Sequence, residues 1–478
     1  MLHCALWKNT HWSCQTMDPR TVSQIAEWIG GKIHGRGVTT VRRIVTDSRQ
    51  VRGGDFFVAL RGEQFDGHDF LPDAQDAGAA GALVSRISPE LVRLSQIEVG
   101  DTLQGLQQMA KAYRSELRLK VVAVTGSNGK TSTKEMTASM LEERLSVSKT
   151  IGNYNNHIGV PLTVLSAGAD DEVGVVEMGM NHTGELLPLC EIARPDFAVI
   201  TNVGAAHIGF LGSREAIAKE KAVVAESVPA DGCVVLNAGD DFTDWIAGRT
   251  KARVIRAGIH RGDVHAHEVR HTEKGECFVL SHGTENALVN LPVHGEHMVA
   301  NACLAAGIGV GLGLSMEEIA RGLSKTIIPG NRFKVQKLGP ILVINDSYNA
   351  NPESMVAALK TALSFSVRGR RVAALGRMGE LGEESKAGHR QVGRAVAELA
   401  FDYLLTVGEE ARLIAQSAGK AGLRATREVD THEQAVEALL DYLEPGDLLL
   451  VKGSLSSAMD RVVQGLESAT YEADRGSR

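Results

Sequence analysis

Short apolar runs rich in β-branched residues recur along this chain, and most of them precede a segment of helical length. In the middle of the chain the expected strands lie at residues 121–125, 173–180, 197–203 and 233–238. The helices expected between them lie at 131–144, 183–193 and 213–227. The pattern starts again with four runs that each precede a helix, at 341–346, 371–376, 403–408 and 447–453. Such alternation predicts an α/β fold, with parallel sheets joined by helical crossovers.

The length of 478 residues suggests about two to four domains, because a single core rarely grows so large. Before the first parallel series we expect a small α/β module with a helix at 22–29. Residues 253–293 alternate in the manner of hairpins, which predicts an antiparallel insertion in the central parallel-sheet domain. "IPGNR" (328–332) is the expected linker to a C-terminal Rossmann-like domain. The predicted organisation is a disordered extension at 1–17, followed by domains at 18–100, 101–329 and 330–478.

Composition excludes several classes of protein. A formal net charge of -7, without any long basic cluster, argues against nucleic-acid binding. The six cysteines contain no CxxC pair, which fits reduced thiols and a cytoplasmic protein better than a zinc site or a disulfide framework. Residues 297–316 carry no formal charge, yet they are rich in glycine and include a histidine and an asparagine. We expect a buried helix of small residues there, and no membrane span.

The stretch "TGSNGKTS" (125–132) follows an expected strand and opens an expected helix. Backbone N–H groups in such a loop hold phosphate, with Lys130 reaching the β- and γ-oxygens and Thr131 holding Mg²⁺. The loop is shorter than the common P-loop, whose first glycine would fall at Val124. The alternative is a glycine-rich turn with an unrelated lysine. We predict that ATP is bound by the loop residues Thr125, Gly126, Ser127, Asn128 and Gly129, together with Lys130 and Thr131.

Two further polar residues lie where a parallel sheet presents ligands, at the carboxyl ends of its strands. Glu177 closes "VGVVE", and His207 lies in the loop after "FAVITNV". They are candidates to complete the coordination of one or two Mg²⁺ ions. The alternative for Glu177 is a solvated or helix-capping acid, and the alternative for His207 is an ordinary polar histidine.

Five stretches, "TGSNGKTS", "EMGMNHTGE", "TNVGAAHIGFLGS", "HMVANA" and "DSYNANPESM", together resemble the Mur ligase family. They follow the family's order, and the resemblance runs from about residue 18 to the end. It implies a UDP-binding N-terminal module, a central ATPase domain and a C-terminal ligase domain. It also implies an ATP-dependent amide ligase, in which a carboxylate attacks the γ-phosphate and an amine then displaces phosphate from the acyl phosphate.

Two stretches, "GNYNNHIGVP" (152–161) and "NDSYNANPESM" (345–355), favour one activity within the family. The implied substrates are UDP-N-acetylmuramoyl-tripeptide and D-alanyl-D-alanine, joined to give the pentapeptide precursor of peptidoglycan. Lysine and meso-diaminopimelate both stay open as the third residue of the stem peptide. The alternatives are a sister ligase that adds the third amino acid, a folylpolyglutamate synthetase, and a catalytically silent nucleotide-binding regulator of wall synthesis. We expect a cytoplasmic monomer that uses ATP and two Mg²⁺ ions.

The resemblance assigns roles to individual residues. Lys130, His207 and Lys221 are the implied catalytic residues, and Lys221 is the lysine implied to become carbamylated, with neighbouring Lys219 as the alternative. The implied metal site consists of Thr131, Glu177, His207 and Lys221. His297 and Asn301 are the implied adenine-side residues, Arg332 is the implied linker arginine, and Asp346 is the implied ribose-binding aspartate. The implied substrate-binding residues are Ser48 and Arg49 for the uridine diphosphate, and Asn155, Asn156, Asn349 and Asn351 for the peptidyl substrate.

Two positions depart from the family's pattern. Arg377 stands where "GDMxELG" has an acid, and Leu455 stands where "VKGSR" has a base. We interpret the two changes as one compensated pair, which bears on the dipeptide pocket and leaves the ATP chemistry unaffected.

Overall fold

The computed structural model describes residues 16–476, and the chain divides into two compact units. The first unit contains the described residues up to Val124 together with 144–179 and 185–198. The second contains 125–143, 180–184 and the chain from 199 onward. Of the predicted extension, residues 1–15 lie outside the described residues, whereas Met17 is buried.

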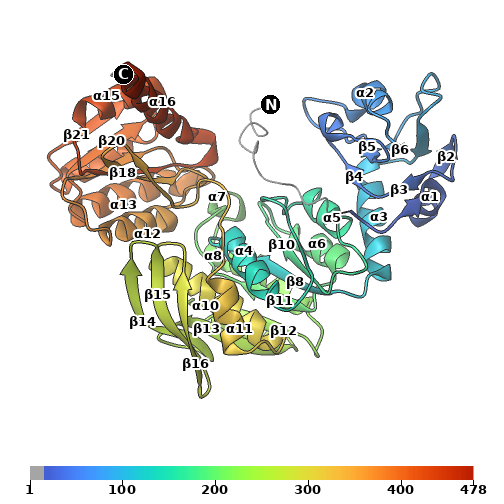
Figure 1. The fold of residues 1–478 in the computed structure, drawn as a ribbon, viewed down its shortest axis with the longest axis horizontal. Helices are drawn as coiled ribbons and strands as arrows, with labels where there is room; N and C mark the ends of the chain where they lie inside the picture. Colours follow the sequence, from blue (N-terminus) through green and yellow to red (C-terminus); the bar gives the residue numbers. More distant parts are fainter. Residues whose placement is uncertain (1–15, 477–478) are drawn as a thin grey trace. The chain divides into compact units, whose positions relative to one another are not determined.

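The first unit begins with the predicted small α/β module (Figure 1). Its five-stranded sheet has the order β2 (Lys32–His34), β7 (Ser95–Glu98), β6 (Gly81–Val84), β5 (Phe56–Val58), β4 (Ile44–Val45). All neighbours are parallel except β2 and β7. The helices are α1 (Val22–Ile29) and α2 (Leu71–Asp76). The predicted helix at 22–29 is confirmed at both ends, because Thr21 and Gln24 form a capping box and Gly30 supplies a left-handed C-cap.

The rest of the first unit contains helix α3 (Thr102–Glu116) and three parallel strands. The strands are β8 (Lys120–Thr125), β10 (Val173–Glu177) and β9 (Val147–Lys149), with β10 between the other two. Helices α5 (Gly159–Val164) and α6 (Leu186–Ala193) accompany them. The predicted strands at 121–125 and 173–180 are confirmed, although β10 ends at Glu177. Strand β9 was not predicted, since it has only three residues and one of them is lysine.

The chain continues with strands in the order β11 (Phe197–Ile200), β12 (Cys233–Asn237), β13 (Arg253–Ile259), β14 (Val264–Thr272), β15 (Gly275–His282), β16 (Glu285–Leu291). All of them belong to the second unit except the first two residues of β11. The prediction of an antiparallel insertion from residue 253 is wrong in part. Strand β13 is parallel to both neighbours, and the hairpins begin only at β14, within the same sheet. The four-residue connection before β14 turns through His260 and Gly262, both with positive φ. Alternation in a sequence marks a strand but not its direction.

Helices of the second unit surround these strands: α4 (Lys130–Leu141), α7 (Ile208–Leu211), α8 (Arg214–Glu226), α9 (Thr243–Ala247), α10 (Glu296–Gly311) and α11 (Met316–Leu323). Most of α10 is buried, which confirms the predicted helix of small residues. Within residues 16–476, no helix is long and apolar enough to cross a membrane.

The C-terminal part of the second unit is a six-stranded sheet with helices on both faces (Figure 1). The order is β17 (Lys334–Leu338), β18 (Ile341–Asp346), β22 (Leu448–Lys452), β19 (Arg371–Leu375), β20 (Tyr403–Val407), β21 (Thr426–Val429). All pairs are parallel except β17 with β18. The helices are α12 (Pro352–Leu363), α13 (Ser385–Glu398), α14 (Arg412–Lys420), α15 (His432–Tyr442) and α16 (Asp460–Gly476). The four strands predicted after residue 341 are confirmed.

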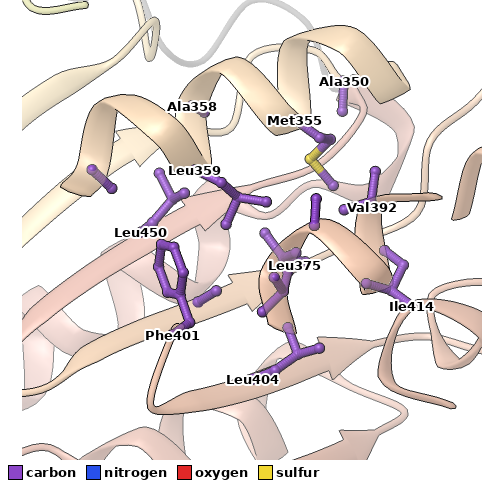
Figure 2. Packing of buried hydrophobic residues seen from close by; sticks show 14 of the residues in the cluster. Ala350, Met355, Ala358, Leu359, Leu375, Val392, Phe401, Leu404, Ile414 and Leu450 are labelled. Atoms are coloured by element: carbon purple, nitrogen blue, oxygen red, sulfur yellow. The ribbon is translucent and has the colours of Figure 1, made fainter. Parts of the chain in front are cut away.

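Two hydrophobic cores lie against this sheet, one on each face. Figure 2 shows the one in which Met355 and Leu359 of α12 meet Leu375 of β19 and Val392 of α13. On the other face, residues of α15 and α16 such as Leu439 pack on the same strands. Because both faces are covered, the strand ends are the places left for ligands. Asp346 and Lys452 stand opposite each other at the carboxyl ends of β18 and β22.

Candidate active site

The loop 125–131 has the geometry of a phosphate cradle. Strand β8 ends at Thr125 and helix α4 begins at Lys130, with Gly129 as its N-cap at φ 80°. Glycine has no side chain, so Gly129 cannot cap the first N–H groups of α4, and they face the loop. A Cβ on Gly126, at φ 148°, would overlap the hydroxyl of Thr201. A Cβ on Gly129 would lie 2.6 Å from Asn301 Oδ1, so both positions require glycine.

The loop after β11 braces this cradle. Asn202 accepts hydrogen bonds from the backbone N–H groups of Ser127, at 3.0 Å, and Asn128, at 2.9 Å. The Thr201 hydroxyl donates to the Asn128 carbonyl oxygen. The glycine-rich stretch is therefore fixed in place by hydrogen bonds with the loop after β11.

Two cations lie at the cradle. The ammonium of Lys130 donates to the carbonyl oxygens of Gly126, at 2.8 Å, and Ser127, at 3.3 Å, so it lies against the loop. Arg332 donates from Nη2 to the Thr131 hydroxyl at 3.1 Å, and its guanidinium stacks 3.6 Å from the centre of the Tyr348 ring. The predicted linker arginine is thus brought to the predicted metal-binding threonine. Together the two cations place positive charge beside the loop, which suits an anion such as phosphate.

The close approach of Asn301 to Gly129 leads to a testable prediction. We expect Gly129→Ala to raise the Kd for ATP by at least about 10-fold, because the added methyl displaces Asn301 and distorts the cradle. Gly313→Ala is the matched control: Gly313 has φ 78°, but no heavy atom lies within 4 Å of its Cβ position. Both variants carry the backbone strain of roughly 1–2 kcal/mol. Equal ATP affinities, measured by calorimetry, would contradict this account of the loop.

His207 pairs with Glu380, a residue that was not among the predicted site residues. Its Nδ1 lies 2.8 Å from Glu380 Oε2, and the imidazole lowers the pKa of Glu380. Both residues have positive φ, 64° and 63°, a strained conformation for residues with side chains. The signal for Glu380 was present in "GRMGELG", where only Arg377 was singled out.

Lys221 is distinguished from Lys219 by burial. On helix α8 the side chain of Lys221 is 1% exposed, whereas Lys219 is exposed. Burial lowers the pKa of Lys221 well below its usual value, and the charge of Lys130 lowers it further. The lowered pKa increases the share of the neutral amine, which is the form that reacts with CO₂ to give a carbamate.

A second polar cluster lies at the carboxyl ends of β18 and β22. Asp346 Oδ2 pairs with the ammonium of Lys452 at 2.7 Å, and Asp346 Oδ1 accepts from the Phe333 N–H at 3.0 Å. His297 lies edge-on to the Phe333 ring, with centroids 6.2 Å apart. Burial lowers the pKa of His297, and Asp346 partly offsets that effect. Lys452, only 3% exposed, was missed by the sequence analysis, although it lies in the "VKGSL" stretch.

Asn301 and Asn351 are placed beside the cradle. Asn301, four residues after His297, is buried against Gly129 and supports the loop. Asn351 caps helix α12 with its Oδ1 and donates from Nδ2 to Asn128 Oδ1 at 2.7 Å. Asn349 has its Oδ1 bonded to the Ala350 N–H at 2.9 Å. Next to this contact, Glu353 accepts from the Ala205 N–H at 3.0 Å, another link that the sequence analysis missed.

Five of the predicted site residues lie in the first unit: Ser48, Arg49, Asn155, Asn156 and Glu177. Glu177 is 1% exposed, accepts a hydrogen bond from Asn155 Nδ2 at 2.7 Å, and stands opposite Val124 in the sheet. Asn156 accepts from the N–H groups of Ile158 and Gly159 and shapes the turn before α5. Arg49 is exposed and pairs with Asp47 at 2.7 Å, in the short 3₁₀ turn that begins at Ser48.

Arg377 contacts the turn that contains Leu455. Its Nη2 donates to the Ser456 hydroxyl at 2.8 Å, and its Nη1 pairs with Glu410 at 3.0 Å. The two departures from the family's pattern therefore lie side by side, which is what a compensated pair requires.

Lys221 could serve as a ligand of a hard divalent cation only if it is modified. Mg²⁺ takes oxygen ligands, and the buried Thr131 hydroxyl would supply one. An amine is a poor ligand for Mg²⁺, whereas a carbamate on Lys221 would supply an anionic oxygen. The lowered pKa of Lys221 is the observation that makes this modification chemically accessible.

Comparison with known proteins supports this architecture. Residues 40–114 match the model "Mur ligase family, catalytic domain", 124–309 match "Mur ligase middle domain", and 331–455 match "Mur ligase, glutamate ligase domain". The UDP-N-acetylmuramoyl-tripeptide–D-alanyl-D-alanine ligase of Bacillus subtilis (strain 168) is 37% identical, over 94% of this chain and 99% of the relative.

Solved structures agree with the sequence comparison. Crystal structure I of MurF from Acinetobacter baumannii superposes with a TM-score of 0.87 and 34% identity, over 94% of this chain and 99% of that one. MurF ligase from Thermotoga maritima in complex with ADP gives a TM-score of 0.80 and 29% identity, over 90% and 98%. Similarity at this level across nearly the whole length shows that the chain belongs to the Mur ligase family.

Proposed function

We propose that this protein is an ATP-dependent amide ligase that joins D-alanyl-D-alanine to UDP-N-acetylmuramoyl-tripeptide. The product is the UDP-muramoyl-pentapeptide precursor of peptidoglycan. Relatives that carry this activity in their names match the chain over nearly its full length. The observation in the structure that carries the proposal is the cradle of residues 125–131, with Lys130 and Arg332 beside it.

The reaction requires two anions to approach each other. The tripeptide carboxylate attacks the γ-phosphorus of ATP, and ADP leaves with the bridging oxygen. The amine of D-alanyl-D-alanine then attacks the acyl phosphate, the C–N bond forms, and phosphate leaves with one of the original carboxylate oxygens. Lys130 and Arg332 supply positive charge where the transferred phosphoryl group gains negative charge, which lowers the barrier of the first step.

The second unit also contains the residues that we propose bind the metal ion and the adenosine part of ATP. Mg²⁺, when bound, would neutralise triphosphate charge, and we propose Thr131, His207 and a carbamate on Lys221 as residues that hold it. The carbamate forms when the neutral Lys221 amine attacks CO₂ and releases one proton. We propose that Asp346 binds the ribose, with His297 on the adenine side. Lys452 orients the Asp346 carboxylate through their 2.7 Å ion pair.

Other predicted contacts are retained as proposals. They are Glu177 as a metal ligand, Ser48 and Arg49 for the uridine diphosphate, and Asn155, Asn156, Asn349 and Asn351 for the peptidyl substrate. Asn351 and Asn301 have a further proposed role, since they contact Asn128 and Gly129 and so shape the cradle. We also retain the predicted domain boundaries at 18–100, 101–329 and 330–478, and a cytoplasmic, monomeric enzyme.

Acceptor specificity separates the candidate functions. The purified protein is given ATP, Mg²⁺ and UDP-muramoyl-tripeptide, and phosphate release is measured with and without D-alanyl-D-alanine. We expect release to depend on the dipeptide and to match pentapeptide formation. UDP-muramoyl-dipeptide with lysine or meso-diaminopimelate tests the sister activity, and folate with glutamate tests the synthetase. Turnover only with one of these other pairs would overturn the proposal, and no turnover with any pair would favour the silent regulator.

A further inference from the structure

A histidine–carboxylate cluster lies outside the site described above. His271 on β14 and Glu276 on β15 are direct cross-strand partners, and His294 lies in the turn before α10. One potential ligand atom from each of the three residues lies within 4.8 Å of the other two. Glu276 is 5% and His294 8% exposed, so the cluster is mostly buried.

Not every ligand atom of the cluster takes part in a hydrogen bond with the described residues. His271 Nδ1 lies 3.0 Å from Glu276 Oε1 and 3.2 Å from the Ser364 hydroxyl. The Gly295 N–H donates to Glu276 Oε1 at 2.8 Å and fixes that carboxylate. His294 Nδ1 is buried and has no hydrogen-bond partner among the described residues. A buried polar atom without a partner destabilises the fold, and a ligand bound to it would remove that cost.

The surroundings make the cluster suitable for a metal ion. The ring of Phe365 lies 4.7 Å from both histidine rings, centroid to centroid, and shields the cluster from one side. His271 is 21% exposed, which leaves access for water as a further ligand.

We propose that His271, Glu276 and His294 form a binding site for one divalent transition-metal ion of the Zn²⁺ type. Two imidazole nitrogens and one carboxylate oxygen are a donor set that Zn²⁺ uses, with water in the fourth position. The same set discriminates against Mg²⁺, which prefers oxygen ligands. Metal–ligand bonds of about 2.0–2.2 Å require ligand atoms roughly 3.3–3.6 Å apart, so small side-chain rotations close the site. A bound ion would join the β14–β15 hairpin to the turn before α10.

The test uses the full-length protein after removal of metal by a chelator, without nucleotide and with Mg²⁺ in excess. Co²⁺ is the probe, because its visible absorption reports tetrahedral coordination by nitrogen and oxygen. We expect one equivalent to bind, Zn²⁺ to displace it, and the Tm to rise when either metal is added. His294→Ala and Glu276→Gln should each weaken Co²⁺ binding by at least about 100-fold.

Three controls make the result decisive. His282→Ala removes a partly exposed histidine from the same hairpin and should leave Co²⁺ affinity unchanged. Lys221→Ala should also retain it, since the site is independent of the proposed carbamate. Glu276→Gln keeps the shape of the side chain, so its Tm without metal shows whether the fold is intact. Failure of the unmodified protein to bind one equivalent, or unchanged binding in both ligand variants, would overturn the proposal and leave a histidine–glutamate pair that only packs on Phe365.

Discussion

The variant Lys130→Ala should lose at least about 100-fold in turnover while keeping its fold. The ammonium of Lys130 lies against the cradle, 2.8 Å from the Gly126 carbonyl oxygen, at the start of helix α4. When triphosphate enters, this charge is expected to turn toward the phosphate oxygens. Loss of one group that stabilises transition-state charge costs about 3–4 kcal/mol, which corresponds to about 10²–10³ in rate.

The control for this prediction is Lys120→Ala, at the other end of strand β8. Lys120 is exposed and pairs with Asp196 at 3.1 Å, so its loss should change turnover by less than about two-fold. Circular dichroism and the Tm establish that both variants are folded. Near-normal phosphate release by folded Lys130→Ala would contradict the assignment of residues 125–131 as the phosphate cradle.

The second large effect concerns Lys221. We expect Lys221→Ala to lose nearly all activity, and acetate or formate to restore part of it, because a small carboxylate can replace the anionic group of a carbamate. Lys219→Ala is the matched control from the same helix, and its exposed side chain should be dispensable. Assays of phosphate release over a range of acetate concentrations measure both results.

Carbon dioxide gives an independent test of the same residue. Carbamate formation consumes the neutral amine, whose population falls as pH drops through its pKa, and the folded protein lowers the pKa of Lys221. Removal of CO₂ should therefore lower activity, the loss should grow as pH falls, and bicarbonate should restore activity. Full activity of Lys221→Ala without any carboxylate would show that Lys221 has no part in the reaction.

Local patterns predicted the buried elements well. Strands β18, β19, β20 and β22 are apolar and buried in the middle of a sheet, so their sequences signal them directly. Helix α1 has the predicted bounds, and the structure shows that its caps, Thr21 and Gly30, flank it directly in the sequence. Strands β17 and β21 were missed because they are edge strands with mostly polar, partly exposed residues.

Contacts between distant residues could not be predicted in the same way. The pairs His207–Glu380 and Asp346–Lys452 join strands and loops that are far apart in the chain, and only the fold brings them together. The roles of Asn301 and Asn351 beside the cradle depend on close approach to Gly129 and Asn128, which residue type alone does not reveal. Burial likewise separated Lys221 from Lys219, two lysines on the same helix.

Transfer of oxygen from carboxylate to phosphate tests the central claim most directly. UDP-muramoyl-tripeptide labelled with ¹⁸O in its reacting carboxylate is incubated with ATP, Mg²⁺ and D-alanyl-D-alanine, and the released phosphate is analysed by mass spectrometry. An ATP-dependent ligase that works through an acyl phosphate places one ¹⁸O in each phosphate for each pentapeptide formed. Pentapeptide formation with unlabelled phosphate would contradict the acyl-phosphate route and the role assigned to the Lys130 cradle.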